Sequence, residues 1–347
     1  MKFRLAAAII AAALSLTACS GATPGKKADP ASKNNSEKLV EVSPLTGLEL
    51  PDGRPNRPIM VAKIDNTASA NPQYGLNKAD LVVEELVEGG LTRLAAFFYT
   101  NTPSKIGPVR SARGTDIGIA APVNAQLIAS GGAPKTNKRV KSAGIKFHSE
   151  DAGAKGFSSD PNRGRPYNRL MNLKTLLKSM TAVDIPGPYF TWSAKASKKS
   201  EVPGTDASPD ASATPVPQPK TATSASVGFS RSSVTKWGFK DGKWSRTNGI
   251  AASGTEFKAD TMVVLFSKVG DAGYLDPAGN NVPETEFEGG GRAVVFHGDS
   301  VIEGTWAKQN LDSTITMLDE AGEPLTLAPG NVWIELVPKG DGNVSFK

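Results

Sequence analysis

Acidic residues and arginines gather on one stretch of the chain, residues 80–113. Glu84, Glu85 and Glu88 precede a Gly-Gly step, Arg93 follows it, and the stretch ends in Arg110-Ser111-Ala112-Arg113. Guanidinium groups bind carboxylates or phosphates through paired hydrogen bonds, and a Gly-Pro turn at 107–108 can present backbone N–H groups beside them. The first hypothesis is a binding site for an anion or a glycan carboxylate. Its predicted residues are Asp65, Glu85, Glu88, Arg93, Arg110, Ser111, Arg113 and Asn168.

The same charges allow two other interpretations. In the structural one, Arg110 and Arg113 pair with Glu85 and Glu88 and fix the loop, although buried ion pairs add little net stability. In the catalytic one, Glu85 and Glu88 serve as general acid and base, as two carboxylates do in glycoside cleavage. Strict strand alternation places residues 84, 86 and 88 on one face and residue 85 on the other. Glu85 and Glu88 therefore converge only if the strand bends near Gly89.

The sequence lacks the residue combinations that nucleophilic catalysis, metal binding or nucleotide binding would need. Ser111 as a nucleophile needs a base, and the only histidines are His148 and His297. Two distant histidines and one cysteine give no metal-ligand spacing, and no phosphate-binding glycine motif of the nucleotide type is present. We therefore expect no cofactor and no metal, and the sequence favours a non-catalytic protein. Four tryptophans could stack on sugars but are more typical of a β-rich core: Trp237, Trp244, Trp306 and Trp333.

Residues 81–99 must position the charges, and they predict a β-hairpin. Apolar runs flank Gly89-Gly90, and glycine adopts positive φ without steric cost. Around this hairpin, residues 44–194 mix short strands (59–64, 125–129, 145–148) with helices (116–121, 135–143, 172–180), which indicates a mixed α/β domain.

The second half of the chain reads as mainly β. Asp241-Gly242 and Gly298-Asp299 are hairpin turns, and residues 261–266, 314–318, 325–327 and 332–336 predict strands. Residues 227–347 therefore predict a smaller β-rich domain, and the fold class is α+β. Residues 195–226 are rich in Ser, Thr, Ala and Pro, which predicts a disordered linker or insertion.

The N-terminus predicts export and a lipid anchor. Lys2 and Arg4 precede an apolar run at residues 5–16 that is too short to span a bilayer, which is typical of a signal peptide over residues 1–18. Leu16-Thr17-Ala18-Cys19 resembles the lipobox of bacterial lipoproteins, in which the cysteine carries acyl chains such as palmitate. Residues 19–43 then form a flexible tether, and the protein is expected on the outer face of the cell membrane.

The amino-acid composition limits the classes of binding partner that we expect. The net charge of +6 over 347 residues is mild and lacks the clustered basic stripe of a nucleic-acid binder. The expected partners are the membrane, through Cys19, and either an anionic wall polymer or an envelope protein.

Several motifs resemble the YerB-like bacterial lipoproteins, known as domain of unknown function 3048, which has an N-terminal and a C-terminal part. The motifs are Asp65-Asn66, Pro72-Gln73, Ala79-Asp80, VEGGLTR (87–93), IGPVRSAR (106–113), Gly131-Gly132, WSRTNG (244–249), Gly304-Thr305-Trp306 and APGNVW (328–333). The resemblance covers nearly everything after residue 44 except the low-complexity segment, and it carries no established activity. The family commonly has histidines where this chain has Ala129 and Tyr167, which puts a histidine-based mechanism in doubt here.

Together these features predict a lipid-anchored binding or scaffold module of the cell envelope. A rival interpretation is an enzyme that cleaves or transfers wall glycan using Glu85 or Glu88. A third is a regulator of another envelope enzyme.

Overall fold

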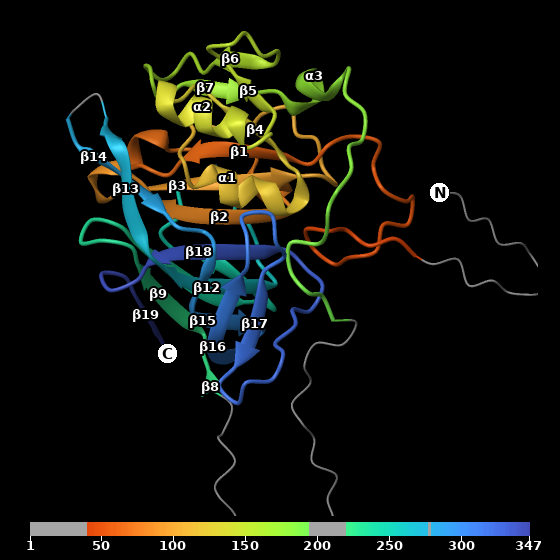
Figure 1. Cartoon of the computed structure of the whole chain (residues 1–347), viewed down its shortest axis with the longest axis vertical. Coiled ribbons are helices and arrows are strands. Elements are labelled where there is room, and N and C mark those ends of the chain that lie inside the picture. Colours follow the sequence, from red (N-terminus) through yellow and green to blue (C-terminus); the bar gives the residue numbers. More distant parts are fainter. Residues whose placement is uncertain (1–39, 194–219, 277–278) are drawn as a thin grey trace, which may run out of the picture. The chain divides into compact units, whose positions relative to one another are not determined.

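Strands from both halves of the chain join one long sheet in the computed structural model of the protein. The structure describes residues 40–193, 220–276 and 279–347. Cys19, the predicted signal peptide and most of the predicted tether and linker lie outside these residues. Figure 1 shows the strand labels of the sheet following one another from β5 near the top to β17 near the bottom.

Within the described residues this sheet has 11 strands, and β8 pairs with β16 beside the main order. The order is β17 (Thr316–Asp319), β16 (Ser300–Lys308), β15 (Gly289–His297), β12 (Thr261–Ser267), β18 (Val332–Pro338), β2 (Leu81–Leu86), β3 (Thr92–Phe98), β1 (Met60–Asp65), β4 (Gln126–Ala129) and β5 (Phe147–Ser149), with β8 at Lys220–Thr221.

The two halves meet where β2 pairs in parallel with β18. The register places Leu81 opposite Val332, Glu84 opposite Glu335 and Glu85 opposite Leu336. The segments expected as an α/β domain and a β-rich domain thus follow one another along the chain but contribute to a single sheet.

The predicted hairpin is confirmed. β2 and β3 pair antiparallel with Glu85 opposite Arg93, and the turn is the short 3-10 helix η3 (Glu88–Gly90) with Gly89 and Gly90 at φ 71° and 69°. These left-handed backbone angles explain the need for glycine at both places. The hairpins at Asp241-Gly242 and Gly298-Asp299 are confirmed as β10 (Val234–Lys240) with β11 (Lys243–Arg246) and as β15 with β16.

Both faces of the long sheet are buried. One face packs on α1 (Asp116–Ala120), α2 (Pro134–Ser142) and the segment around Tyr189. The other packs on α3 (Leu173–Leu177) and on a second sheet of four strands. The second sheet contains β11 (Lys243–Arg246), β10 (Val234–Lys240), β9 (Ser224–Gly228) and β19 (Asn343–Phe346). The four tryptophans predicted as core are buried.

Smaller elements complete the fold. They are the strand pairs β13 (Val269–Leu275) with β14 (Asn281–Thr285) and β6 (Phe157–Ser159) with β7 (Arg169–Met171), and the 3-10 helices η1 (Ala68–Ala70), η2 (Leu76–Lys78) and η4 (Ala121–Val123). Within the described residues, none of the helices has the length and apolar content needed to cross a membrane.

Several sequence predictions need correction. The molecule is mostly β, because the predicted helices are short and the one expected over 172–180 covers only Leu173–Leu177. Residues 220–226, expected as part of a disordered linker, form β8 and the start of β9, where Ala225 is buried between β10 and β19. Strand pairing here overrides a composition that is poor in large apolar residues. Order also begins earlier than predicted, since Ser43 is buried. Residues 325–327 form no strand, and Leu327 makes only an isolated bridge to Trp192.

Candidate functional site

A small pocket lies at the turn of the β2–β3 hairpin and brings together half of the predicted site residues. We call it the hairpin pocket; its volume is about 220 Å³. Its walls are Asp65, Thr67, Val87, Glu88, Gly89, Leu91, Thr92, Arg93, Arg110, Tyr167, Asp276 and Asn280. The last two residues follow β13 and precede β14, so both halves of the chain build the pocket.

Glu88 is the centre of charge pairing beside this pocket. Its carboxylate accepts a hydrogen bond from Arg93 Nη2 at 3.1 Å and one from Arg113 Nε at 2.9 Å, and it also accepts from Arg113 Nη2. Burial alone would raise the pKa of Glu88, but the Arg113 hydrogen bond and the two positive charges outweigh it and lower that pKa. Glu88 therefore remains ionised at neutral pH.

Arg93 and Arg113 are held from several sides. Arg93 Nη1 donates to the carbonyl oxygen of Ser111 at 3.0 Å, and Arg113 Nη1 donates to the carbonyl oxygen of Ala112 at 2.7 Å. Burial and the nearby Arg113 charge lower the pKa of Arg93 to about 10, which still leaves it charged at neutral pH. These two arginines act mainly as internal partners of Glu88.

Arg110 is less constrained than the other two arginines. Its Nη1 donates to Asp65 Oδ2 at 2.7 Å, and its guanidinium carbon lies 5.2 Å from the ring centre of Tyr167. The side chain retains 18% of its exposure and lines the hairpin pocket. Among the described residues, its side chain donates no other hydrogen bond, so further N–H groups of the guanidinium remain for a ligand.

Glu85 does not reach this pocket. It is 0% exposed and accepts a hydrogen bond from Lys63 of β1, which also pairs with Asp116 of α1 at 2.9 Å. Burial would lower the pKa of Lys63, but the attraction of Asp116 and Glu85 outweighs it and raises that pKa. Sequence reasoning missed Lys63, and the available signal was a lysine inside the apolar run Met60-Val61-Ala62-Lys63-Ile64.

The remaining predicted residues lie around the pocket and not in its wall. Ser111 contributes its carbonyl oxygen to Arg93, and Asn168 has a buried side-chain oxygen with no hydrogen-bond partner in the described structure. Its neighbour Tyr167, at one of the two positions where the family commonly has histidine, forms part of the pocket wall. The other position, Ala129, is buried in β4.

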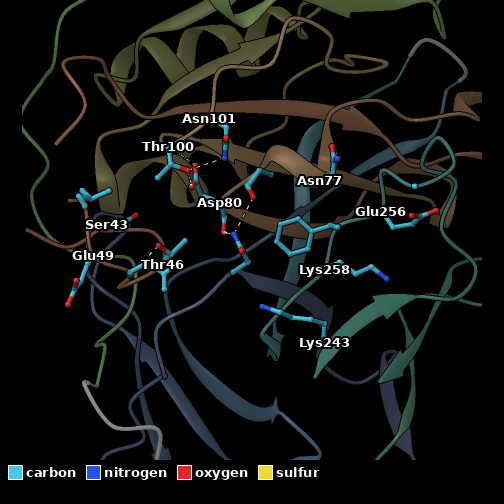
Figure 2. A pocket seen from close by; sticks show the side chains of 16 residues that line it. Ser43, Thr46, Glu49, Asn77, Asp80, Thr100, Asn101, Lys243, Glu256 and Lys258 are labelled. Atoms are coloured by element: carbon cyan, nitrogen blue, oxygen red, sulfur yellow. Dashed lines mark hydrogen bonds between the residues drawn. The ribbon is translucent and has the colours of Figure 1, made fainter. Parts of the chain in front are cut away.

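A larger cavity of about 730 Å³ lies where loops of the two halves meet, and Figure 2 shows its polar side chains. Asp80 lies at its inner wall and accepts hydrogen bonds from the backbone of Tyr99 and Thr100. Lys243 is paired with Asp260, whereas the exposed Lys258 forms no ion pair with any described residue. No sequence pattern predicts this cavity, because its walls come from short loops far apart in the chain.

The part of the chain that the structure describes contains no candidate metal-binding site. No three His, Cys, Asp or Glu side chains gather closely enough there to hold an ion.

Comparison with known proteins identifies the family. The chain belongs to the DUF3048 proteins of unknown function: the N-terminal domain of that family matches residues 45–185 and the C-terminal domain matches residues 225–334. The resemblance read from the sequence motifs is thereby confirmed.

A curated relative is described as the putative lipoprotein YerB of Bacillus subtilis (strain 168). It is 26% identical over 312 residues, which cover 86% of this chain and 87% of the relative. The crystal structure of the YerB protein from Bacillus subtilis matches with a TM-score of 0.69 and 21% identity, over 88% of this chain and 99% of that one. This structural likeness shows a shared fold.

Proposed function

We propose that this protein is an exported, lipid-anchored binding module of the cell envelope whose ligand carries an anionic group held at Arg110. Two facts support the anchor. The similar Bacillus protein is described as a putative lipoprotein, and Cys19 ends a lipobox-like segment. The anchor would keep the described domain at the outer face of the membrane, where anionic wall polymers are available.

The observation that carries the binding role is the state of Arg110. Its guanidinium lines a pocket and donates one side-chain hydrogen bond, to Asp65, within the described structure. A carboxylate or phosphate binds a guanidinium best through two parallel hydrogen bonds. The hairpin pocket, at about 220 Å³, suits one such group at the end or side of a larger ligand.

The same geometry disfavours glycan cleavage by the two glutamates. Glu85 is fully buried against Lys63, so a substrate in water cannot reach it. Glu88 has a lowered pKa because Arg113 and Arg93 hold it, whereas a general acid needs a raised one. The pair therefore supplies neither the access nor the proton that the reaction requires.

Binding of the purified protein to isolated anionic wall polymer tests the proposal. We expect Arg110→Ala to weaken retention roughly tenfold, since a hydrogen bond to a charged group is lost. Lys258→Ala is the matched control, because Lys258 lines the larger cavity and forms no ion pair among the described residues. Loss of binding in the control alone would move the site to the larger cavity. Absence of binding by the unchanged protein would reject the proposal.

The anchor is tested separately. Cys19→Ser should release the protein from the membrane fraction into the soluble fraction of cells, because the cysteine sulfur would carry the lipid. Continued membrane association of this variant would contradict the anchor without bearing on Arg110.

A further inference from the structure

Three ionisable side chains lie together on the face of the long sheet that β9, β10 and β11 cover. Glu84 of β2 and Glu335 of β18 stand directly opposite each other in the parallel pairing and are 1% and 0% exposed. Arg246, at the end of β11, lies over the ring of Trp333 with 4.7 Å between its guanidinium carbon and the ring centre. We call these three the inner charge cluster.

None of the three forms an ion pair within the described part of the chain. Glu84 Oε1 accepts hydrogen bonds only from neutral groups: Asn66 Nδ2 at 3.0 Å, Thr92 Oγ1 at 2.7 Å and Thr235 Oγ1 at 3.0 Å. Its Oε2 is buried and has no hydrogen-bond partner in the described structure. A buried carboxylate oxygen left in this way is expensive unless something else binds it.

Glu335 and Arg246 are also held by neutral groups. Trp237 Nε1 donates to Glu335 Oε1 at 2.6 Å. Arg246 donates to Asn66 Oδ1 at 2.8 Å and to Gln73 Oε1 at 3.0 Å. The positive charge of Arg246 is therefore oriented by amide oxygens but is not neutralised by a direct carboxylate contact.

Burial and repulsion between the two carboxyl groups favour the neutral form of Glu335. Like charges directly opposite each other in a sheet repel, and burial together with the Glu84 charge raises the pKa of Glu335 well above its ordinary value. The Glu84 carboxyl and the Arg246 guanidinium therefore have no direct ion-pair contact in the described chain, although each lies within the other's electrostatic reach.

Both of these charged groups line the same small cavity. Its volume is about 160 Å³, and apart from Val234 and Ile250 its walls are polar. The other lining residues are Asn66, Glu84, Thr92, Ser232, Ser233, Thr235, Arg246 and Asn248. At about 30 Å³ per water molecule, this is room for roughly five waters, or for about the six non-hydrogen atoms of alanine.

We propose that this cavity binds a small free α-amino acid as its zwitterion, with the carboxylate at Arg246 and the ammonium group at Glu84. Each unmatched charge of the protein then receives the opposite charge of the ligand. Val234 and Ile250 provide contacts for a methyl-sized side chain. The cavity shares the wall residue Thr92 with the hairpin pocket, but no side chain of the inner charge cluster lines that pocket.

Titration of the purified protein with alanine tests the proposal without any mutation. Trp333 and Trp237 contact the inner charge cluster, so tryptophan fluorescence should change saturably, and thermal unfolding should shift upward. Propionate lacks the ammonium group and ethylamine lacks the carboxylate. Each should bind at least roughly tenfold more weakly than alanine, because each leaves one buried charge unmatched. No saturable response to alanine, or equal responses to all three compounds, would overturn the proposal.

Variants then assign the two charges. Glu84→Gln and Arg246→Gln should each weaken alanine binding roughly tenfold or more, while Arg246→Lys retains part of it. Ser233→Leu fills the cavity from its rim and removes no side-chain hydrogen bond found in the structure, so it should block binding in a folded protein. Arg110→Ala is the matched control and should bind alanine normally. Undiminished alanine binding in both Glu84→Gln and Ser233→Leu would place the ligand elsewhere and reject this site.

Discussion

Strand β2 carries two adjacent glutamates that face opposite sides of the sheet, and the two sides treat them differently. Glu85 meets a buried cation, Lys63, which Asp116 helps to hold. Glu84 meets only neutral donors and a second glutamate, Glu335, across the strand pairing. A buried charge matched inside the fold is a structural part, whereas one left unmatched beside a cavity costs stability and remains available to a ligand.

The largest effect on stability should come from removing Lys63, the cation that pairs with Glu85 and Asp116. Lys63→Met leaves Glu85 and Asp116 buried without their cation and should lower the free energy of unfolding by about 3–5 kcal/mol. Denaturant unfolding measures it. Adding Glu85→Gln should recover part of the loss, because one uncompensated charge is then removed. A Lys63→Met protein within about 1 kcal/mol of the parent would show that the pair is not structural.

Glu88 should come next, because it holds two arginines at once. Glu88→Gln should destabilise the protein by about 2 kcal/mol at neutral pH, the scale of a hydrogen bond to a charged group. The folded state lowers the pKa of Glu88, so its contribution is present above its ordinary pKa and is lost as the pH falls through the folded value. Unfolding curves of parent and variant should therefore converge in acid. A difference that persists unchanged at low pH would contradict this assignment.

Replacing Glu335, on the opposite face of the sheet from Lys63, should have a smaller effect and should raise stability. The folded state raises the pKa of Glu335, so stability is greatest below its ordinary pKa and falls as the pH rises through the folded value. Glu335→Gln keeps a neutral side chain of the same shape. It should stabilise the protein by about 1 kcal/mol or more in alkaline buffer and change little in acid. Stability measured across this pH range decides the sign, and a destabilised variant in alkaline buffer would contradict a raised pKa of Glu335 in the folded state.

The smallest effect on stability is expected at Arg110. Its side chain is 18% exposed and that of its partner Asp65 is 1% exposed, but both line the hairpin pocket. Water can therefore solvate Asp65 once Arg110 is removed, so the pair should contribute no more than about 1 kcal/mol and Arg110→Ala should unfold almost like the parent. Combined with a loss of anion binding, this result would separate a binding role from a structural one. A loss of several kcal/mol would instead place Arg110 with Lys63 among the structural charges.

Local parts of this fold could be predicted from the sequence. The Gly89-Gly90, Asp241-Gly242 and Gly298-Asp299 turns depend on backbone preferences of the residues themselves, so three hairpins were foreseeable. The extent of the helices was not predictable, because α1 and α3 have only five residues each and α1 is buried throughout.

The charged sites were predictable only in part. That arginines and glutamates near the hairpin would meet followed from their spacing, but which would pair depended on three-dimensional packing. Lys63 of β1 pairs with Glu85 of β2. Glu335 and Arg246, which lie near Glu84, belong to the other half of the chain. The placement of Glu84 opposite Glu335 required the register between β2 and β18, which no local pattern contains.

The parallel pairing of β2 with β18 also has a consequence for how the protein is made. β18 begins at Val332, close to the C-terminus, yet it occupies the middle of the long sheet. Synthesis reaches this strand only after the other strands of the long sheet, so the sheet cannot close until the chain through Pro338 has been made. A chain truncated before Val332 would keep the pairing of β2 with β3 but leave the β18-facing edge of β2 unpaired, as a template for aggregation.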